Sequence, residues 1–233
     1  MSLTFIENHF KRHYASYDYE VLPPGSLLDP STPMTFVGSA GLSQVEHGIE
    51  HQEEHSGERY VLVQNCFRHF DIEKVGKDPV HLSLFGMGGA FAFGRVSRRD
   101  TLGKIWTFLT DRLGFDGKRL WATYFTGGEL EGHDLAPDRE TYETWQALGL
   151  DEAHIVGAGI EEGYWKQGDG LEGNDRYRKC GPTTELFYDR GAHLCCGPRC
   201  RPGCQCGRFI EISNILFIHD FMDVETNVLS PMV

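Results

Sequence analysis

The sequence predicts a mixed α/β fold of the α+β type, in which a mainly antiparallel sheet is flanked by helices. Apolar and polar residues alternate at residues 60–67, 80–85 and 185–189, which is the pattern of half-buried strands. Apolar residues recur instead at helical spacing over residues 97–114 and 138–148. Because a polar loop rich in turn-forming residues joins the first two strand runs, we expect them to pair as an antiparallel hairpin.

The composition is that of a globular protein. With 233 residues, 40% hydrophobic and 24% charged, the chain can bury a core and is expected to form one domain over residues 1–233. Its formal net charge of −12 argues against a wide basic surface for nucleic acid. Neither a signal peptide nor an apolar run of the roughly 20 residues that a membrane span requires is found, so a cytoplasmic protein without membrane association is expected.

An amphipathic helix is predicted near the start of the chain, since Ile6, Phe10 and Tyr14 lie four residues apart. The Pro-Pro-Gly segment at residues 23–25 ends it. The hydrophilic run at residues 46–58 carries histidines four residues apart, which on a helix could gather at a metal ion. A solvated acidic face is the favoured interpretation, because the run lacks an apolar surround, and we assign no site there.

The first strand of the predicted hairpin delivers Arg68 at its end. A guanidinium is planar and always charged, so an Arg fixed at the rim of a hairpin is suited to holding a phosphate or a carboxylate with two hydrogen bonds. The alternative is an ordinary surface hairpin whose Arg is solvated, and periodicity alone favours that alternative.

The middle of the chain is predicted to form part of the core, two strands and a turn. Trp106 is expected in the core, residues 120–125 form a predicted buried strand, and residues 154–156 form a short one. Trp165 precedes a loop rich in Gly and Asn, after which a turn is expected at residues 180–182. A lone Trp beside such a loop is typical of a core or interface position.

Two later segments carry polar side chains on predicted strands. Glu185 and Asp189 fall on one face, and carboxylates at the edge of a nucleotide site commonly hold Mg²⁺. A polar solvent face is the alternative, and Glu185 is the better candidate of the two. Further on, a period of two places Ile212, Asn214 and Leu216 on one face, so we expect a buried Asn whose hydrogen-bond partner could be a bound amino acid.

Cysteines concentrate in one insertion, at residues 193–207. Such clustering is unlike a disulfide scaffold, and the spacing Cys-x3-Cys-x3-Cys-x-Cys with intervening Gly and Pro permits the tight turns of a tetrahedral thiolate site. A zinc site and an unloaded loop are about equally expected, with His193 and Cys195 as substitute ligands. The predicted zinc ligands are Cys196, Cys200, Cys204 and Cys206.

Taken together, these segments resemble the alanyl-tRNA synthetase family of the class II aminoacyl-tRNA synthetases. Residues 64–94 resemble motif 2 of that family, and residues 28–42 resemble its motif 1 region in part. The segments Cys180-Gly181-Pro182-x-x-Glu185 and Arg208-Phe209-x-Glu211-Ile212-x-Asn214 resemble later parts of its catalytic domain and occur in the same order. The resemblance implies a class II synthetase fold over nearly the whole chain.

The resemblance also implies a reaction, in which an amino-acid carboxylate attacks the α-phosphorus of ATP and leaves an acyl-adenylate. Arg68 would bridge the α-phosphate and the attacking carboxylate, as the catalytic residue. Mg²⁺, a small amino acid with alanine favoured, and tRNA bound by a longer chain are the other partners implied. ATP would be bound by Arg68, His81, Phe85, Met87 and Glu185. The amino acid would be bound by Trp165, Asn214 and Leu216.

The chain ends at Val233, before the Gly-x-Gly-x-Glu-Arg motif 3 of that family. One expectation is therefore a catalytic domain that is incomplete at its C-terminus. The other is a degenerate paralogue that binds a nucleotide or an amino acid, or that loads an acceptor other than tRNA.

Overall fold

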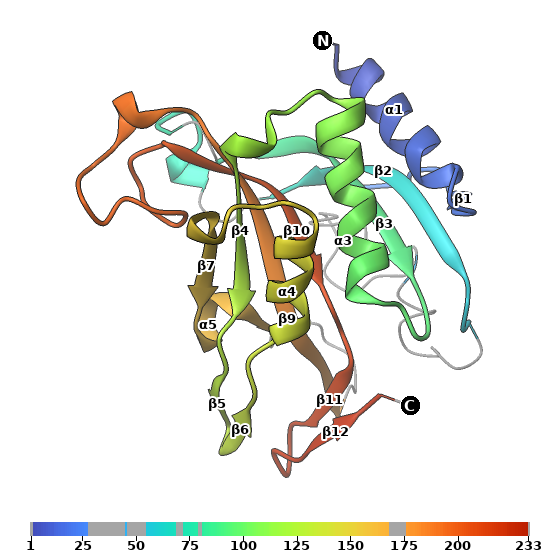
Figure 1. Cartoon of the computed structure of the whole chain (residues 1–233). Coiled ribbons are helices and arrows are strands. Elements are labelled where there is room, and N and C mark those ends of the chain that lie inside the picture. Colours follow the sequence, from blue (N-terminus) through green and yellow to red (C-terminus); the bar gives the residue numbers. More distant parts are fainter. Residues whose placement is uncertain are drawn as a thin grey trace. The chain divides into compact units, whose positions relative to one another are not determined.

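A computed structural model describes residues 2–27, 45, 55–68, 72–78, 81–167 and 176–232 (Figure 1). The chain divides into two compact units, Met1–Leu113 with Val233, and Gly114–Met232. The segment that resembles motif 1 and residues 46–54 of the histidine run lie outside the described residues. Within the described part, no helix is long and apolar enough to cross a membrane.

The first unit contains the predicted hairpin. β2 (Arg59–Phe67) pairs antiparallel with β3 (Leu84–Ala92) without a break in register, and β1 (Glu20–Val21) pairs parallel with β2. The return strand was expected at residues 80–85, but it begins only at Leu84. The reason is local: Asp78 accepts hydrogen bonds from the backbone N–H and the ring of His81, which ties His81 to Asp78 and not to the opposite strand. The short helical turn η1 (Ile72–Lys74) precedes Asp78.

Two helices accompany this sheet. α1 (Leu3–Ala15) begins at Ser2, whose Oγ accepts a hydrogen bond from the N–H of Phe5. It packs closely on β3, because a Cβ built on Gly88 would lie 3.0 Å from the ring of Phe10. α3 (Arg98–Thr107) continues into a π-helical turn, η2 (Phe108–Arg112). Its buried stripe contains Leu102, Ile105 and Leu109, so the expectation that Trp106 is core was wrong: it lies beside that stripe and is half-buried.

The second unit is built around β9 (Tyr177–Asp189), a strand of 13 residues. The C-terminal half of β9 lies between β10 (Phe209–Leu216) and β4 (Leu120–Phe125), both antiparallel to it. The N-terminal half lies between β11 (Asp220–Asp223) and β8 (Tyr164–Lys166). The sheet is mainly antiparallel, as predicted.

Further strands extend this sheet on both sides. β7 (Ile155–Ala158) pairs parallel with β4, and β12 (Leu229–Pro231) pairs antiparallel with β11. A separate two-stranded sheet joins β5 (Gly128–Leu130) to β6 (His133–Leu135). Short 3-10 turns precede β4 and β7 and follow β9, namely η3 (Gly117–Arg119), η4 (Glu152–His154) and η5 (Ala192–Leu194).

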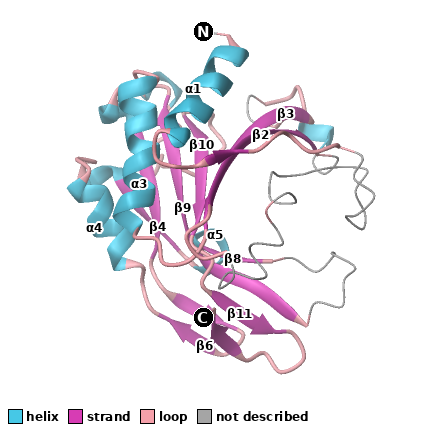
Figure 2. Ribbon diagram, turned by 90° about the vertical axis from the view of Figure 1, so that its right-hand side faces the viewer, coloured by secondary structure: helices cyan, strands magenta, loops and turns pink. Residues whose placement is uncertain are grey.

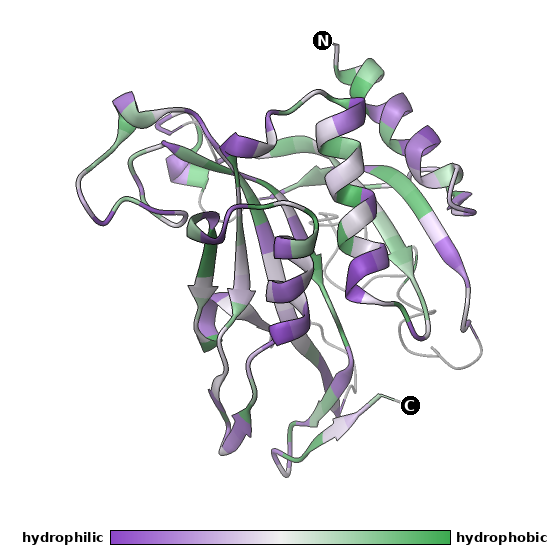
Figure 3. Ribbon diagram, viewed as in Figure 1, coloured by the Kyte–Doolittle hydropathy of each residue, from purple (hydrophilic) through white to green (hydrophobic). Residues whose placement is uncertain are grey.

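α4 (Arg139–Ala147) covers one face of this sheet (Figure 2). Trp145 is fully buried beneath it and donates a hydrogen bond from Nε1 to Oγ1 of Thr184 on β9, at 2.9 Å. The side of α4 that faces the viewer in Figure 3 is mostly hydrophilic, as expected for an amphipathic helix. A second helix, α5 (Ile160–Gly163), leads directly into β8.

The predicted turn at residues 180–182 was wrong, because this segment lies inside β9. Neighbouring strands pair with it on both sides, Trp165 opposite Gly181 and Asp220 opposite Cys180. Gly181 permits this arrangement because the carbonyl oxygen of Phe217 lies so close that a Cβ would sit 2.0 Å from it.

Candidate functional site

The rim of the β2–β3 hairpin holds Arg68 in a defined position. Its backbone N–H donates a hydrogen bond to the carbonyl oxygen of Ser83 at 2.8 Å, so the residue closes the end of the ladder. Its guanidinium lies over the ring of Phe85, 5.0 Å from the ring centroid, a cation–π contact that contributes about 0.5–1 kcal/mol at an exposed site. The contact restrains the guanidinium on the face of the hairpin that carries Phe85.

The other expected nucleotide residues of the hairpin lie near Arg68 along the chain. Met87 follows Phe85 by two residues on β3, so both side chains stand on one face of the hairpin, opposite the face that Phe10 of α1 covers at Gly88. His81 is tied to Asp78, ring Nδ1 to Oδ2, at 2.6 Å. The structure thus groups Arg68, Phe85 and Met87, and places His81 in the loop that precedes Ser83.

In the second unit, strand pairing brings four predicted residues onto one face of the sheet. Asn214 pairs with Glu185, and Leu216 pairs with Thr183, two residues before Glu185 on β9. Paired residues share a face, as do residues two apart on a strand. Trp165 joins them because it pairs with Gly181, a further two residues back. The face therefore carries Trp165, Glu185, Asn214 and Leu216.

Asn214 is exposed, which corrects the expectation of a buried amide in an apolar row. The cause is a β-bulge: the register shifts between Glu211 and Ser213, so Ile212 pairs with no residue of β9 and the alternation starts again after it. The amide finds a partner within the chain, since its Nδ2 donates a hydrogen bond to Oε1 of Glu185 at 3.2 Å. Because the Nδ2 group is the donor to this carboxyl, the amide oxygen of Asn214 takes no part in the hydrogen bond.

Glu185 is the residue of this face whose pKa is shifted. Burial raises its pKa to about 7, with further contributions from the nearby carboxylates of Glu211 and Glu162. Its backbone N–H donates a hydrogen bond to Oγ1 of Thr123, which fixes the strand at this position. A half-buried carboxyl that ionises near neutral pH, beside further carboxylates, is suited to binding a cation such as an ammonium group or Mg²⁺.

Sequence reasoning did not assign Glu211 and Glu162 to the site. Glu211 reaches this face because it pairs with Phe187, two residues from Glu185, and that register depends on the bulge at Ile212. Glu162 comes from α5, a helix of only four residues that no periodicity indicates. Glu211 was noted only as part of the segment that resembles the family, and no sequence pattern indicated Glu162.

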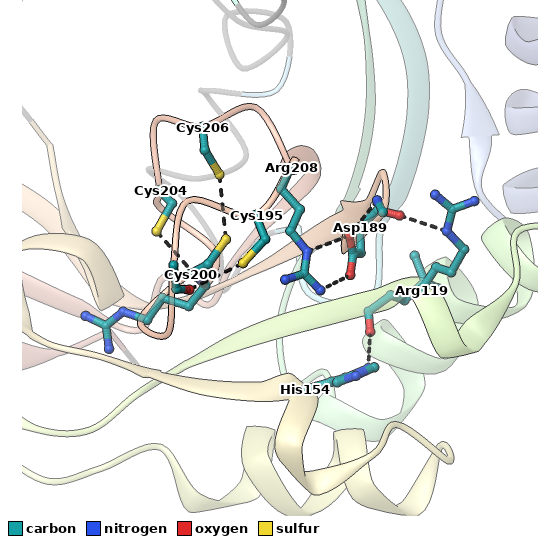
Figure 4. A network of polar contacts seen from close by, with 12 residues as sticks. Arg119, His154, Asp189, Cys195, Cys200, Cys204, Cys206 and Arg208 are labelled. Carbon is teal, nitrogen blue, oxygen red and sulfur yellow. Dashed lines mark hydrogen bonds and ion pairs between the residues drawn. The ribbon is translucent and has the colours of Figure 1, made fainter. Parts of the chain in front are cut away.

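The cysteine loop gathers its thiols (Figure 4). The Sγ atoms of Cys196, Cys200 and Cys204 all lie within 4.8 Å of one another, and Sγ of Cys206 lies 3.6 Å from that of Cys200. Cys195 instead directs its Sγ to the carbonyl oxygen of Gly197, at 3.3 Å. Three of the four thiols that the spacing singled out thus come together, and the fourth, that of Cys206, lies next to Cys200.

Asp189, which was considered as a Mg²⁺ ligand beside Glu185, has a structural role. Arg208 donates two hydrogen bonds to its carboxylate, at 2.9 Å and 2.6 Å, and lowers the pKa of Asp189. Arg119 donates a third hydrogen bond to the carbonyl oxygen of the same residue, at 2.8 Å. The Arg208 contacts fasten the end of β9 to the start of β10, and the Arg119 contact joins η3 to the end of β9 (Figure 4).

Comparisons of the chain with a family model and with curated proteins agree on one family. The family described as tRNA synthetases class II (A) matches residues 5–232. An alanine–tRNA ligase of Rubrobacter xylanophilus is 35% identical over 221 residues, which are 91% of this chain and 24% of the relative. The alanine–tRNA ligase of Acetivibrio thermocellus is 31% identical over 219 residues, 93% of this chain and 23% of the relative. That of Desulforudis audaxviator is 30% identical over 233 residues, 100% of this chain and 24% of the relative.

The chain therefore spans about a quarter of the length of the curated relatives that it matches.

Proposed function

Because the chain belongs to the family of class II (A) tRNA synthetases, we propose that it activates a small amino acid with ATP. The amino-acid carboxylate attacks the α-phosphorus, pyrophosphate leaves, and an aminoacyl-adenylate forms. One observation carries the proposal: Asn214 and Glu185 form a hydrogen-bonded pair on the sheet face that also carries Trp165 and Leu216. This face offers acceptors for an ammonium group beside apolar walls, which is what a small zwitterion requires.

Alanine is the amino acid that we favour. Its methyl group needs only a small apolar space, such as one walled by Trp165 and Leu216. The similar proteins from Rubrobacter xylanophilus and Acetivibrio thermocellus are alanine–tRNA ligases, which supports this choice. The amide oxygen of Asn214 is positioned by the Glu185 contact to accept from the substrate ammonium.

Arg68 is the residue that we assign to the reacting phosphate. Charge builds up on the phosphate oxygens as the carboxylate attacks, and a guanidinium already restrained over Phe85 can stabilise it without being reoriented. His81, Phe85 and Met87 complete the proposed nucleotide contacts on the same hairpin.

Mg²⁺ is expected to accompany ATP. Glu185 would be the ligand, because carboxylate oxygens are what this ion prefers, and Glu211 and Glu162 lie near enough to add their negative charge to its surroundings. The ion would supply positive charge that offsets the charge of the phosphates. We assign two roles to Glu185 itself. It gives up its proton near neutral pH, and it holds the side chain of Asn214 in place.

Transfer of the acyl group to tRNA is the part of the proposal that concerns the longer protein. The relatives extend far beyond the matched region, and the net charge of −12 leaves this chain without a broad basic surface. We therefore propose that tRNA is bound by segments outside residues 1–233, and that the reaction takes place in the cytoplasm.

Exchange of labelled pyrophosphate into ATP tests the proposal. The purified protein is incubated with ATP, Mg²⁺ and each member of a panel of amino acids, and alanine is expected to support the fastest exchange. If no amino acid supports exchange while calorimetry shows that ATP still binds, the chain is a binding module and not an activating enzyme.

A further inference from the structure

We propose that Cys196, Cys200, Cys204 and Cys206 bind one zinc ion, and that this ion holds together the loop between β9 and β10. The inference goes beyond amino-acid activation, since it concerns a second site on the same chain. It stands on the positions of the thiols, on the turns that present them, and on the composition of the loop.

The distances between the thiols fit a tetrahedral zinc site closely. A Zn–S bond of about 2.3 Å places the sulfur atoms of such a site about 3.8 Å apart. Cys200 and Cys206 are already 3.6 Å apart, and Cys196, Cys200 and Cys204 lie within 4.8 Å of one another. Shifts of about 1 Å or less therefore bring the sulfur atoms of Cys196, Cys200 and Cys204 to bonding positions, and Cys206 already lies at that distance from Cys200.

Tight turns present two of these thiols. The N–H of Cys200 donates to the carbonyl oxygen of Gly197, and the N–H of Cys204 donates to that of Arg201, each at 3.0 Å. Each bond closes a four-residue turn that ends on a cysteine. The N–H of Arg201 also donates to Sγ of Cys204 at 3.3 Å, which directs that sulfur back toward the loop. The backbone is thus arranged around the sulfur atoms.

Apolar packing cannot hold this loop in place. Residues 195–207 contain no large aliphatic or aromatic side chain, only Cys, Gly, Pro, Arg and Gln. Fixing the backbone of one residue costs about 1–2 kcal/mol of conformational entropy. Without buried apolar surface to offset this cost, an ordered loop needs a cross-link, and a structural zinc ion supplies one.

The charges around the loop also favour a metal thiolate centre. Binding proceeds as Zn²⁺ plus four thiols to a dianionic zinc tetrathiolate, with release of four protons. Arg199 and Arg201 flank Cys200 and are exposed, and neither side chain has a hydrogen-bond or ion-pair partner among the described residues. Their positive charges can compensate the negative charge of the loaded site.

The loop offers a matched control for the experiment. Cys195 is the neighbour of Cys196, yet its Sγ points to the carbonyl oxygen of Gly197 and lies outside the group of four thiols. Cys195→Ser should therefore leave metal binding intact, whereas Cys200→Ser and Cys206→Ser should remove a ligand. The three variants carry the same chemical change within one loop.

The test is metal content combined with a spectroscopic titration. Protein purified under reducing conditions, loaded with Zn²⁺ and freed of excess metal, should contain about one zinc per chain by elemental mass spectrometry. Cys195→Ser should match it, and Cys200→Ser and Cys206→Ser should lose at least tenfold in zinc affinity. Titration of the unmutated protein with Co²⁺ should give the intense charge-transfer absorption of a tetrathiolate, a readout that does not depend on the folding of a variant.

Three results would overturn the inference. One is Co²⁺ or Zn²⁺ binding by the unmutated protein no tighter than by Cys200→Ser. Another is an equal loss of zinc in Cys195→Ser. The third is a Cys200–Cys206 disulfide, found by mass spectrometry of the protein in its native state. Pyrophosphate exchange is measured separately, so failure of the zinc site and failure of amino-acid activation are distinguishable.

Discussion

Asn214 donates a hydrogen bond to Glu185 across the β9–β10 pair, with 3.2 Å between Nδ2 and Oε1. The pair forms because a bulge at Ile212 brings Asn214, and not a neighbour, opposite Glu185. The exposed amide is thereby oriented by a half-buried carboxyl. We interpret this arrangement as a preformed acceptor for the amino group of the substrate.

Replacing Asn214 by Ala should weaken amino-acid binding. Loss of one hydrogen bond to a charged group costs about 1.5–3 kcal/mol, so the KM for alanine in pyrophosphate exchange should rise at least tenfold, with that for ATP unchanged. Ser213→Ala is the control, because Ser213 pairs with Leu186 and stands on the opposite face of the strand. An unchanged KM for alanine in Asn214→Ala would remove this residue from the pocket.

Glu185 should make stability depend on pH. Its pKa in the folded protein is raised from 4.5 to about 7, so the folded protein holds more protons than the unfolded chain between these pH values. Stability from this group is present at low pH and falls as pH rises through that window. Glu185→Gln should therefore raise Tm at pH 8 and leave it unchanged near pH 4. Since Glu185 is only half-buried, the gain is about 1 kcal/mol after discounting for solvent.

Thermal melts at both pH values check this prediction. Glu161→Gln is the control, because Glu161 is exposed on the same short helix as Glu162. A Glu185→Gln variant whose Tm differs from that of the unmutated protein by the same amount at pH 4 and at pH 8 would contradict the assignment of the raised pKa.

Arg68→Ala should reduce exchange by two to three orders of magnitude, the range typical for loss of one preorganised charge on a transition state. Its fold should persist, since Arg68 is at the rim of the hairpin and not in the core. Arg99→Ala, an exposed change on α3, should leave the rate unaltered. Exchange by Arg68→Ala at the unmutated rate, with equal Tm, would rule out the role assigned to this residue.

Gly181→Ala should destabilise the second unit. The new Cβ would lie 2.0 Å from the carbonyl oxygen of Phe217, and overpacking of this kind costs about 1–3 kcal/mol. At Gly159 a Cβ meets no atom within 4 Å, so Gly159→Ala is the control. Chemical denaturation compares the two, and equal free energies of unfolding would show that the approach of Phe217 does not constrain this position.

Much of the fold could be predicted from local patterns. The helical spacing of Ile6, Phe10 and Tyr14 predicted α1, alternation predicted β2 to within one residue, and the expected buried strand at residues 120–125 is β4. These features depend on the burial of one face, which the order of apolar residues records directly.

The corrected features depend instead on contacts between distant segments. Residues 180–182 contain Gly and Pro, yet they lie in a strand because β8 and β11 pair with them and Phe217 needs the space that Gly181 leaves. The bulge that exposes Asn214 exists only in the register of β10 against β9. The approach of Glu162 and Glu211 to Glu185 has the same origin, so alternation alone could not indicate it.

The central claim is that this chain forms an aminoacyl-adenylate, and direct detection of that product tests it best. The purified protein is mixed in excess with ATP, Mg²⁺ and alanine in the presence of pyrophosphatase, and the acid-quenched mixture is analysed by mass spectrometry. We expect alanyl-adenylate in amounts close to that of the protein, and much less with Arg68→Ala. Uptake of ATP without any adenylate, for alanine and for every other amino acid, would contradict the account.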